Sequence, residues 1–235
     1  PGASSKSKIA EGGHAADMDL LLLRAVVAEA AARLVGQEIQ RVASLGRDRY
    51  LLRFTTAAHD NLLIAVRPDL PRLHLLVRQK RIAEAPPDPF AALLDRTIGG
   101  AVLTGLTIRP WDRIVDLSLR SPEGECTLVV ELIGRSANLL LVGPDGIVLG
   151  LCRDLDSAFR APRMGVRYAA PPGRERLADL PFGPEAVAAI AARGGDPAAA
   201  IEQASPLIAR LAVAGGPRRE EALAAILDRA VRDDW

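Results

Sequence analysis

Cysteine and histidine are scarce in the sequence. The 235 residues include 2 cysteines, Cys126 and Cys152, and 3 histidines, and the two cysteines do not form a CxxC pair. A structural zinc site takes four cysteine or histidine ligands at short, regular spacings, and a disulfide framework needs paired cysteines. We therefore expect a reduced, cytoplasmic protein with no metal and no cofactor.

Aromatic residues and long apolar runs are also few. Phe, Trp and Tyr together make up 3% of the chain, too few for a sheet surface on which RNA bases stack. The apolar runs fall well short of the roughly 20 residues that cross a bilayer. No basic segment followed by an apolar stretch begins the chain, so neither a membrane span nor secretion is expected.

The common catalytic motifs are missing as well. The sequence contains no GxxxxGK[ST] phosphate loop, no GxGxxG after a strand, no GxSxG and no HExxH. These absences argue against ordinary nucleotide-dependent enzymes and hydrolases. His59 and His74 could be combined into a serine triad on paper, but His74 lies in the strand-like RLHLLV, where a packed histidine is the simpler interpretation.

Arginine is abundant. Of 30 basic residues only Lys6, Lys8 and Lys80 are lysines, so 27 are arginines, while the net charge is just +1. A GC-rich coding bias explains this usage, and arginine is also the side chain suited to bidentate phosphate contacts. Net charge alone would not reveal a nucleic-acid-binding protein.

The hydrophobic pattern predicts an α+β protein that contains helices and two series of antiparallel strands. Asp19 is placed to cap a first helix that Gly36 ends, and Asp88 to cap a second that ends at Gly99. Short β-type runs occupy 39–81 and 101–153, a proline-rich connector 161–174, and four short helices the stretch from 184 to 234. We expect a leader or non-native remnant at 1–17, one domain at 18–172 and a helical domain at 173–235.

Asp19, Asp112 and Arg113 are the candidate functional residues. Asp19 precedes the first helix, and Asp112 and Arg113 open the strand DRIVDLSL just after the turn at Arg109 and Pro110. A helix cap accounts for Asp19, and an ion pair beside a turn accounts for the other two. Spacing alone does not decide between these structural roles and a functional one.

These residues lie in stretches that resemble the NFACT family, also known as fibronectin-binding A N-terminal domain proteins. The resemblance covers residues 18–172, and the matching stretches occur in family order: DLLLLR (19–24), LVGQEIQRV (34–42), RLHLL (72–76), PPDPFAALL (86–94), WDRIVDLSL (111–119), VVELIGRSANLLLVG (129–143) and RYAAPP (167–172). SPLIARL (205–211) resembles the core of the family's helix-hairpin-helix domain.

The resemblance implies a fold and a function. The N-terminal domain would be a β-sandwich-like fold with flanking helices, related to the N-terminal domain of formamidopyrimidine-DNA glycosylases. A small helix-hairpin-helix domain would follow it. The family includes the tailing factors of ribosome-associated quality control, which bind tRNA and the obstructed large ribosomal subunit carrying peptidyl-tRNA. Bacterial members add alanine to the stalled chain without mRNA. Such a protein would be an RNA-binding factor rather than an enzyme, because the ribosome forms the bond.

The resemblance also implies site residues. It assigns tRNA binding to Asp19, Asp112 and Arg113, and a structural or RNA-facing role to Gly134, Arg135 and Asn138 of the GR…N signature. One stretch departs from the family: where a basic helix is usual, this chain reads LLDRTIG (93–99) and keeps only Arg96, beside Asp95. The dilution of positive charge makes RNA binding by this helix an open question.

Three alternatives remain open at the level of sequence. Pro1 could serve as the amine of a DNA glycosylase, although Gly2 rather than glutamate follows it. Fibronectin is a possible partner by family name only. The chain could also be a non-catalytic scaffold, as the LLDRTIG departure suggests. Full tailing factors continue into a coiled coil and a further domain, so we expect this chain to be either part of a longer protein or a short member.

Overall fold

The computed structural model describes residues 18–56, 60–76, 82–155, 160–171, 177, 179–213 and 218–232. The expected leader at 1–17, with Pro1, and the candidate histidine His59 lie outside the described residues.

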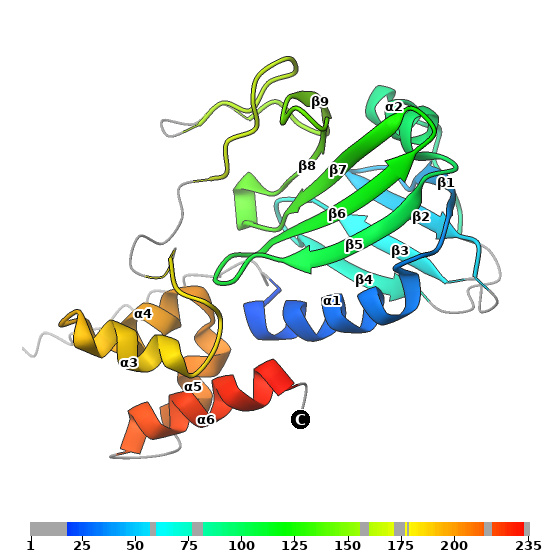
Figure 1. Cartoon of the computed structure of the whole chain (residues 1–235). Helices are drawn as coiled ribbons and strands as arrows, with labels where there is room; N and C mark the ends of the chain where they lie inside the picture. Colours follow the sequence, from blue (N-terminus) through cyan, green and yellow to red (C-terminus); the bar gives the residue numbers. More distant parts are fainter. Residues whose placement is uncertain are drawn as a thin grey trace, which may run out of the picture.

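Two antiparallel sheets form the larger part of the molecule (Figure 1). The first is a run of hairpins in the order β1 (Ile39–Ser44), β2 (Arg49–Phe54), β3 (Asn61–Ala65) and β4 (Arg72–Leu76). The second contains β5 (Val102–Ile108), β6 (Ile114–Ser121), β7 (Gly124–Glu131), β8 (Asn138–Val142) and β9 (Val148–Leu151), again in chain order. A short 3-10 helix, η1 (Gly134–Ser136), joins β7 to β8. The expected α+β class is confirmed.

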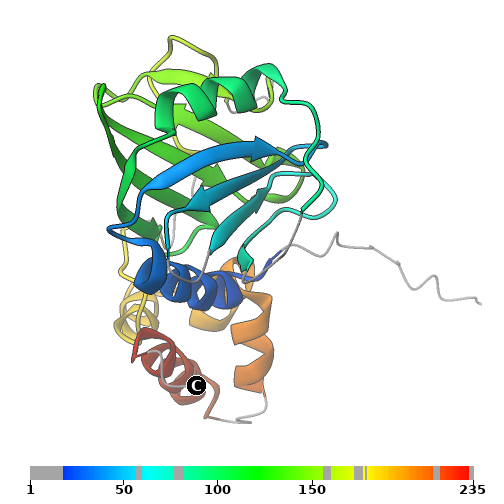
Figure 2. The ribbon, with the colours of Figure 1, turned by 90° about the vertical axis from the view of Figure 1, so that its right-hand side faces the viewer.

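The main core lies between the two sheets, which pack face to face (Figure 1, Figure 2). Alternation along β6 explains how: Val115, Leu117 and Leu119 enter this core, while Ile114 joins a smaller cluster on the outer face. The period of two in IVDLSL (114–119) predicts this split.

A helix lies at each end of the sandwich. Helix α1 (Leu20–Leu34) begins at Asp19, whose carboxylate accepts a hydrogen bond from the Leu21 amide, and the chain leaves it through Gly36 at φ +86°. Helix α2 (Pro89–Ile98) begins at Asp88. Figure 1 and Figure 2 both place α1 and α2 at opposite ends of the sandwich.

Four helices form the smaller, helical part beside the start of α1 (Figure 1). They are α3 (Glu185–Ala192), α4 (Pro197–Ala204), α5 (Pro206–Val213) and α6 (Arg219–Arg232), within the stretch 184–234 where the sequence predicts four short helices. Their core contains Ile190, Ile201 and Ile208, and it also takes in Trp111 from the sandwich. The domain boundary at 172 and the helix-hairpin-helix assignment stay predictions. None of the helices within the described ranges has the length and apolarity to cross a membrane.

Candidate functional site

The turn between β5 and β6 is anchored by Trp111. Its indole is only 5% exposed, and Nε1 donates hydrogen bonds to the backbone carbonyls of Leu180 (3.0 Å) and Pro181 (3.2 Å). The ring also packs against Phe182, with 4.8 Å between centroids. A sandwich residue is thus inserted into the helical part, so the turn that carries it lies at the junction of the two parts.

Asp112 and Arg113 follow directly and are both half-buried. The carboxylate of Asp112 accepts a 2.8 Å hydrogen bond from the backbone N–H of Arg113, and the Arg113 carbonyl accepts one of 2.8 Å from the Leu132 amide. The backbone N–H of Arg109 closes the turn by donating to the Ile114 carbonyl. The backbone of Arg113 is therefore hydrogen-bonded through both its N–H and its carbonyl.

Asp19 lies at the same junction but is directed at a different helix. Besides capping α1, its carboxylate accepts hydrogen bonds from the Ser205 hydroxyl (2.6 Å) and from the backbone N–H of Leu207 (3.2 Å). Both donors belong to the start of α5, where the fully buried Ser205 hydroxyl in turn accepts from the Ile208 amide. Asp19 is therefore bonded to helix ends 186 residues apart along the chain.

One hydrophobic cluster connects these candidates. Leu20 and Leu21, which follow Asp19, share the core of the helical part with Trp111, which precedes Asp112. Arg24 of α1 strengthens the connection, because its guanidinium lies 3.9 Å from the centroid of the Phe182 ring and donates to the Pro110 carbonyl at 3.5 Å. The structure thus brings the first helix and the Asp112–Arg113 turn to one place.

Arg96 is not part of this junction. It is exposed on α2, which lies at the other end of the sandwich (Figure 1, Figure 2). Its neighbour Asp95 accepts a 2.6 Å hydrogen bond from the backbone N–H of Val42, next to an irregularity in the pairing of β1 with β2. The unusual acid of LLDRTIG therefore holds α2 on the first sheet.

The GR…N signature separates into three environments. Asn138 is fully buried; its amide donates to the Arg153 carbonyl (2.9 Å) and its carbonyl accepts from the Arg153 N–H (3.1 Å). Gly134 adopts φ +46°, and Arg135 is exposed. Of the two roles that the resemblance allowed, this geometry is structural for Asn138 and leaves Arg135 facing solvent.

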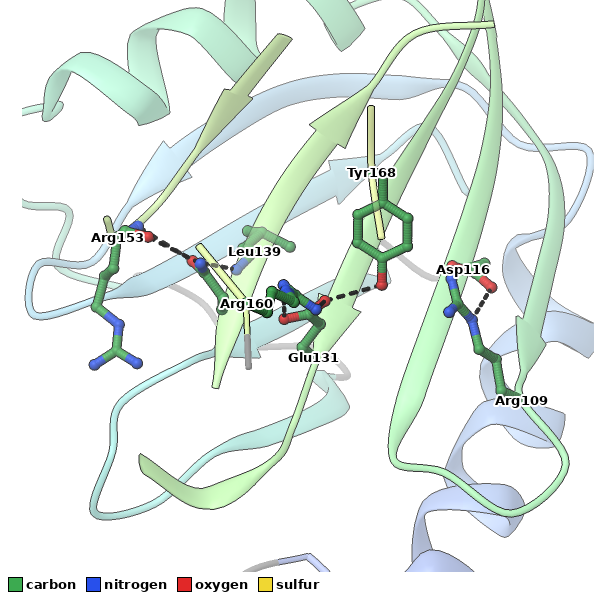
Figure 3. Close-up of polar contacts among 8 residues, drawn as sticks. Arg109, Asp116, Glu131, Leu139, Arg153, Arg160 and Tyr168 are labelled. Atoms are coloured by element: carbon green, nitrogen blue, oxygen red, sulfur yellow. Dashed lines mark hydrogen bonds and ion pairs between the residues drawn. The ribbon is translucent and has the colours of Figure 1, made fainter. Parts of the chain in front are cut away.

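A buried ionic network on the outer face of the second sheet was not anticipated (Figure 3). Arg160 makes a two-pronged ion pair with Glu131, and the Tyr168 hydroxyl donates to the same carboxylate at 2.9 Å. Burial, followed by the nearby Glu131 charge, raises the pKa of Tyr168, so the phenol stays a donor. Arg109 forms a second two-pronged pair with Asp116, at 3.0 and 3.1 Å.

Two hollows open on the sandwich, the first of them beside these groups. One, of about 600 Å³, lies on the outer face of the second sheet and is lined by Arg109, Asp116 and Tyr168 among others. The other, of about 680 Å³, lies between the β1–β2 turn, α2 and β9, where the Tyr50 hydroxyl is 3.2 Å from the Cys152 sulfur. Burial raises the pKa of Cys152 to about 12, so this thiol is protonated and a poor nucleophile at neutral pH.

Neither histidine chemistry nor metal binding finds support in the described ranges. Burial, and then the charge of Arg72, lower the pKa of His74, which lies in β4 as a neutral, partly packed side chain. Within those ranges no three His, Cys, Asp or Glu side chains are grouped as metal ligands would be.

The family follows from comparison with known proteins. The model of the NFACT N-terminal and middle domains matches residues 19–204. The chain belongs to the NFACT family. The match runs through the sandwich, the junction and helices α3 and α4. No curated protein matches the sequence.

Solved structures of similar fold belong to proteins that are named for binding fibronectin or fibrinogen. The N-terminal domain of the fibronectin-binding protein PavA from Streptococcus pneumoniae is 24% identical, with a TM-score of 0.62, over 72% of this chain and 70% of that chain. The N-terminal part of the fibronectin/fibrinogen-binding protein from Streptococcus suis is 19% identical, with a TM-score of 0.65, over 88% of this chain and 83% of that chain. The fibrinogen-binding protein from Staphylococcus aureus is 19% identical, with a TM-score of 0.69, over 92% of this chain and 82% of that chain. At these identities the likeness establishes the shared fold.

Proposed function

We propose that the protein is a cytoplasmic RNA-binding factor of ribosome-associated quality control. It would bind tRNA and the obstructed large ribosomal subunit and support mRNA-independent alanine tailing of stalled chains. The observation that carries the proposal is the anchored turn at the junction, in which Trp111 is buried and the next two residues are half-buried and held by backbone hydrogen bonds. Membership of the NFACT family also supports this proposal.

The roles of the two residues follow from their chemistry. A guanidinium recognises phosphate or a guanine edge through paired N–H donors, so Arg113 would make the RNA contact. Asp112 would set the direction of that arginine, because its carboxylate is already bonded to the Arg113 backbone N–H. The ribosome would form the peptide bond, and this protein would contribute positioning, so it is not an enzyme in its own right.

Arg113→Ala tests the proposal. RNA crosslinked to the chain in cells would be sequenced for wild type and variant, with the position in a sucrose gradient recorded. We expect tRNA and large-subunit rRNA to dominate in wild type and to fall in the variant, while circular dichroism shows intact folding. Arg120→Ala removes one exposed arginine from the far end of β6 and is the matched control.

Two results would contradict the proposal. Unchanged tRNA recovery with Arg113→Ala would remove the assigned role of this residue. If no RNA is enriched with wild type, the chain is a non-catalytic scaffold.

Binding to fibronectin or fibrinogen is a second candidate, drawn from the names of the structurally similar proteins. Purified protein would be passed over immobilised fibronectin, fibrinogen and albumin. Saturable binding to either of the first two and none to albumin would support this candidate. Equal responses on all three surfaces would remove it.

A further inference from the structure

The carboxylate of Asp19 is used almost completely inside the protein. Oδ1 accepts from the Leu21 amide (2.8 Å) and the Ser205 hydroxyl (2.6 Å), and Oδ2 accepts from the Leu207 amide (3.2 Å). A carboxylate has about four acceptor positions, so three of them are already filled. Little capacity remains for accepting hydrogen bonds from a nucleic acid.

The bonded groups lie where the two parts of the molecule meet. Leu20 and Ser205 are both fully buried, and Leu20, Leu21 and Ile208 belong to the core that also holds Trp111. We call the contact of Asp19 with Ser205 and Leu207 the clasp. It joins the start of α1 to the start of α5 by hydrogen bonds. Helix α1 packs on the sandwich, and α5 packs within the helical part.

We propose that Asp19 is a positioning residue that acts on RNA binding through the clasp and does not touch the RNA. The inference rests on the proposed function for its RNA readout. By holding α5 against α1, Asp19 fixes the helical part relative to the turn that presents Arg113. Without the clasp, the start of α5 loses its hydrogen bonds to α1, and an RNA that contacts both parts meets a variable surface.

The first test compares Asp19→Ala, Ser205→Ala and the double variant in a filter-binding assay with tRNA at fixed salt. We expect each single variant to weaken binding about fivefold to tenfold, and the double variant to be no worse than Asp19→Ala, because both remove the same contact. Asp196→Ala is the matched control: Asp196 caps α4 through the Ala198 and Ala199 amides, and both of its partners lie within that helix. Its tRNA affinity should stay near wild type.

Asp19→Asn refines the comparison. The amide oxygen can still accept from the Leu21 amide and the Ser205 hydroxyl, but the NH₂ group cannot accept from the Leu207 amide. Affinity between those of wild type and Asp19→Ala is therefore expected. A full loss in a variant that melts like wild type would instead show that RNA reads the negative charge, and this would overturn the proposal.

A cross-link supplies a rescue. In Asp19→Cys/Ser205→Cys, oxidation replaces the clasp by a disulfide, whose closure is measured by thiol titration. Closed protein should regain tRNA affinity, and the same sample after reduction should lose it. Closed protein that stays inactive would overturn the proposal, as would wild-type affinity in Ser205→Ala.

An RNA-free readout separates failure of the clasp from failure of the proposed function. Amide exchange at Leu207 should quicken in Asp19→Ala relative to Asp196→Ala, because the Leu207 N–H loses its acceptor. Unchanged exchange would overturn the clasp. Faster exchange in a protein that binds no RNA would overturn only the function on which the RNA readout rests.

Discussion

Both terminal nitrogens of the Arg160 guanidinium donate hydrogen bonds to the carboxylate of Glu131, at 2.7 and 2.8 Å. Glu131 is 1% exposed at the end of β7, and Arg160 reaches it from the segment that runs over the outer face of the second sheet. This pair, together with Tyr168, fastens that segment to the sandwich (Figure 3).

Arg160→Ala should therefore destabilise the folded protein more than other substitutions in the segment that covers the second sheet. It leaves a buried carboxylate without its cation, which costs about 3–5 kcal/mol. Tyr168→Phe removes one hydrogen bond to the same carboxylate and should cost about 1 kcal/mol. Urea unfolding followed by circular dichroism measures both, and equal losses in the two variants would contradict this account of the network.

Replacing Trp111 tests the anchor of the junction. Trp111→Ala removes a buried indole from the core of the helical part and should cost about 3–5 kcal/mol. Trp111→Phe keeps an aromatic ring but loses the indole N–H bonds to the Leu180 and Pro181 carbonyls, so about 1–2 kcal/mol is expected. Thermal unfolding ranks the variants. If both melt like wild type, the indole does not join the two parts.

Asp95 and Arg96 are neighbours on α2 with opposite expectations. Asp95→Ala leaves the Val42 N–H without its acceptor and should destabilise the protein by about 1–3 kcal/mol. Arg96→Ala, at an exposed position, should change stability by less than about 0.5 kcal/mol. Chemical denaturation of the two variants decides the matter, and the reverse ranking would show that Asp95 does not hold α2 on the sheet.

Stability should fall on the alkaline side. Burial raises the pKa of Cys126 to about 11 and that of Cys152 to about 12, from the usual 9.0. The folded protein keeps protons that the unfolded chain releases first, so this stabilisation is full below pH 9 and is lost as the pH rises towards 12.

The loss should reach about 1–2 kcal/mol per thiol near pH 10.5. Urea midpoints measured from pH 7 to 10.5 would show it, and Cys126→Ala should give a shallower decline above pH 9. A midpoint that stays constant across that range would contradict the burial of the two thiols.

Much of the fold could be predicted because it depends on local periodicity. Alternation along β6 set its two faces, and aspartates followed by an apolar residue or a proline marked the starts of α1 and α2. The GPDG turn between β8 and β9 was likewise visible. These signals act over a few residues, where sequence order and spatial order agree.

The candidate site depended on contacts that no local pattern encodes. The Asp19 cap could be predicted, but its bonds to Ser205 and Leu207 arise only once the helical part has packed on α1. From the sequence, Asp95 only weakened the positive charge of its helix. In the structure its carboxylate accepts a hydrogen bond from the first sheet. A glutamate in the otherwise apolar VVELIG, with arginines and Tyr168 downstream, was the one available signal of the Glu131 network.

The aspartate caps also shape the electrostatic field that a polyanion meets. Helix starts carry a partial positive charge that commonly attracts phosphate. Here Asp19 neutralises the starts of both α1 and α5, Asp88 that of α2 and Asp196 that of α4, while Glu185 and Glu220 lie in the first turns of α3 and α6. Within the described ranges every α-helix macrodipole is thus offset by a carboxylate of the same chain, and attraction of a phosphate backbone falls to the arginine side chains.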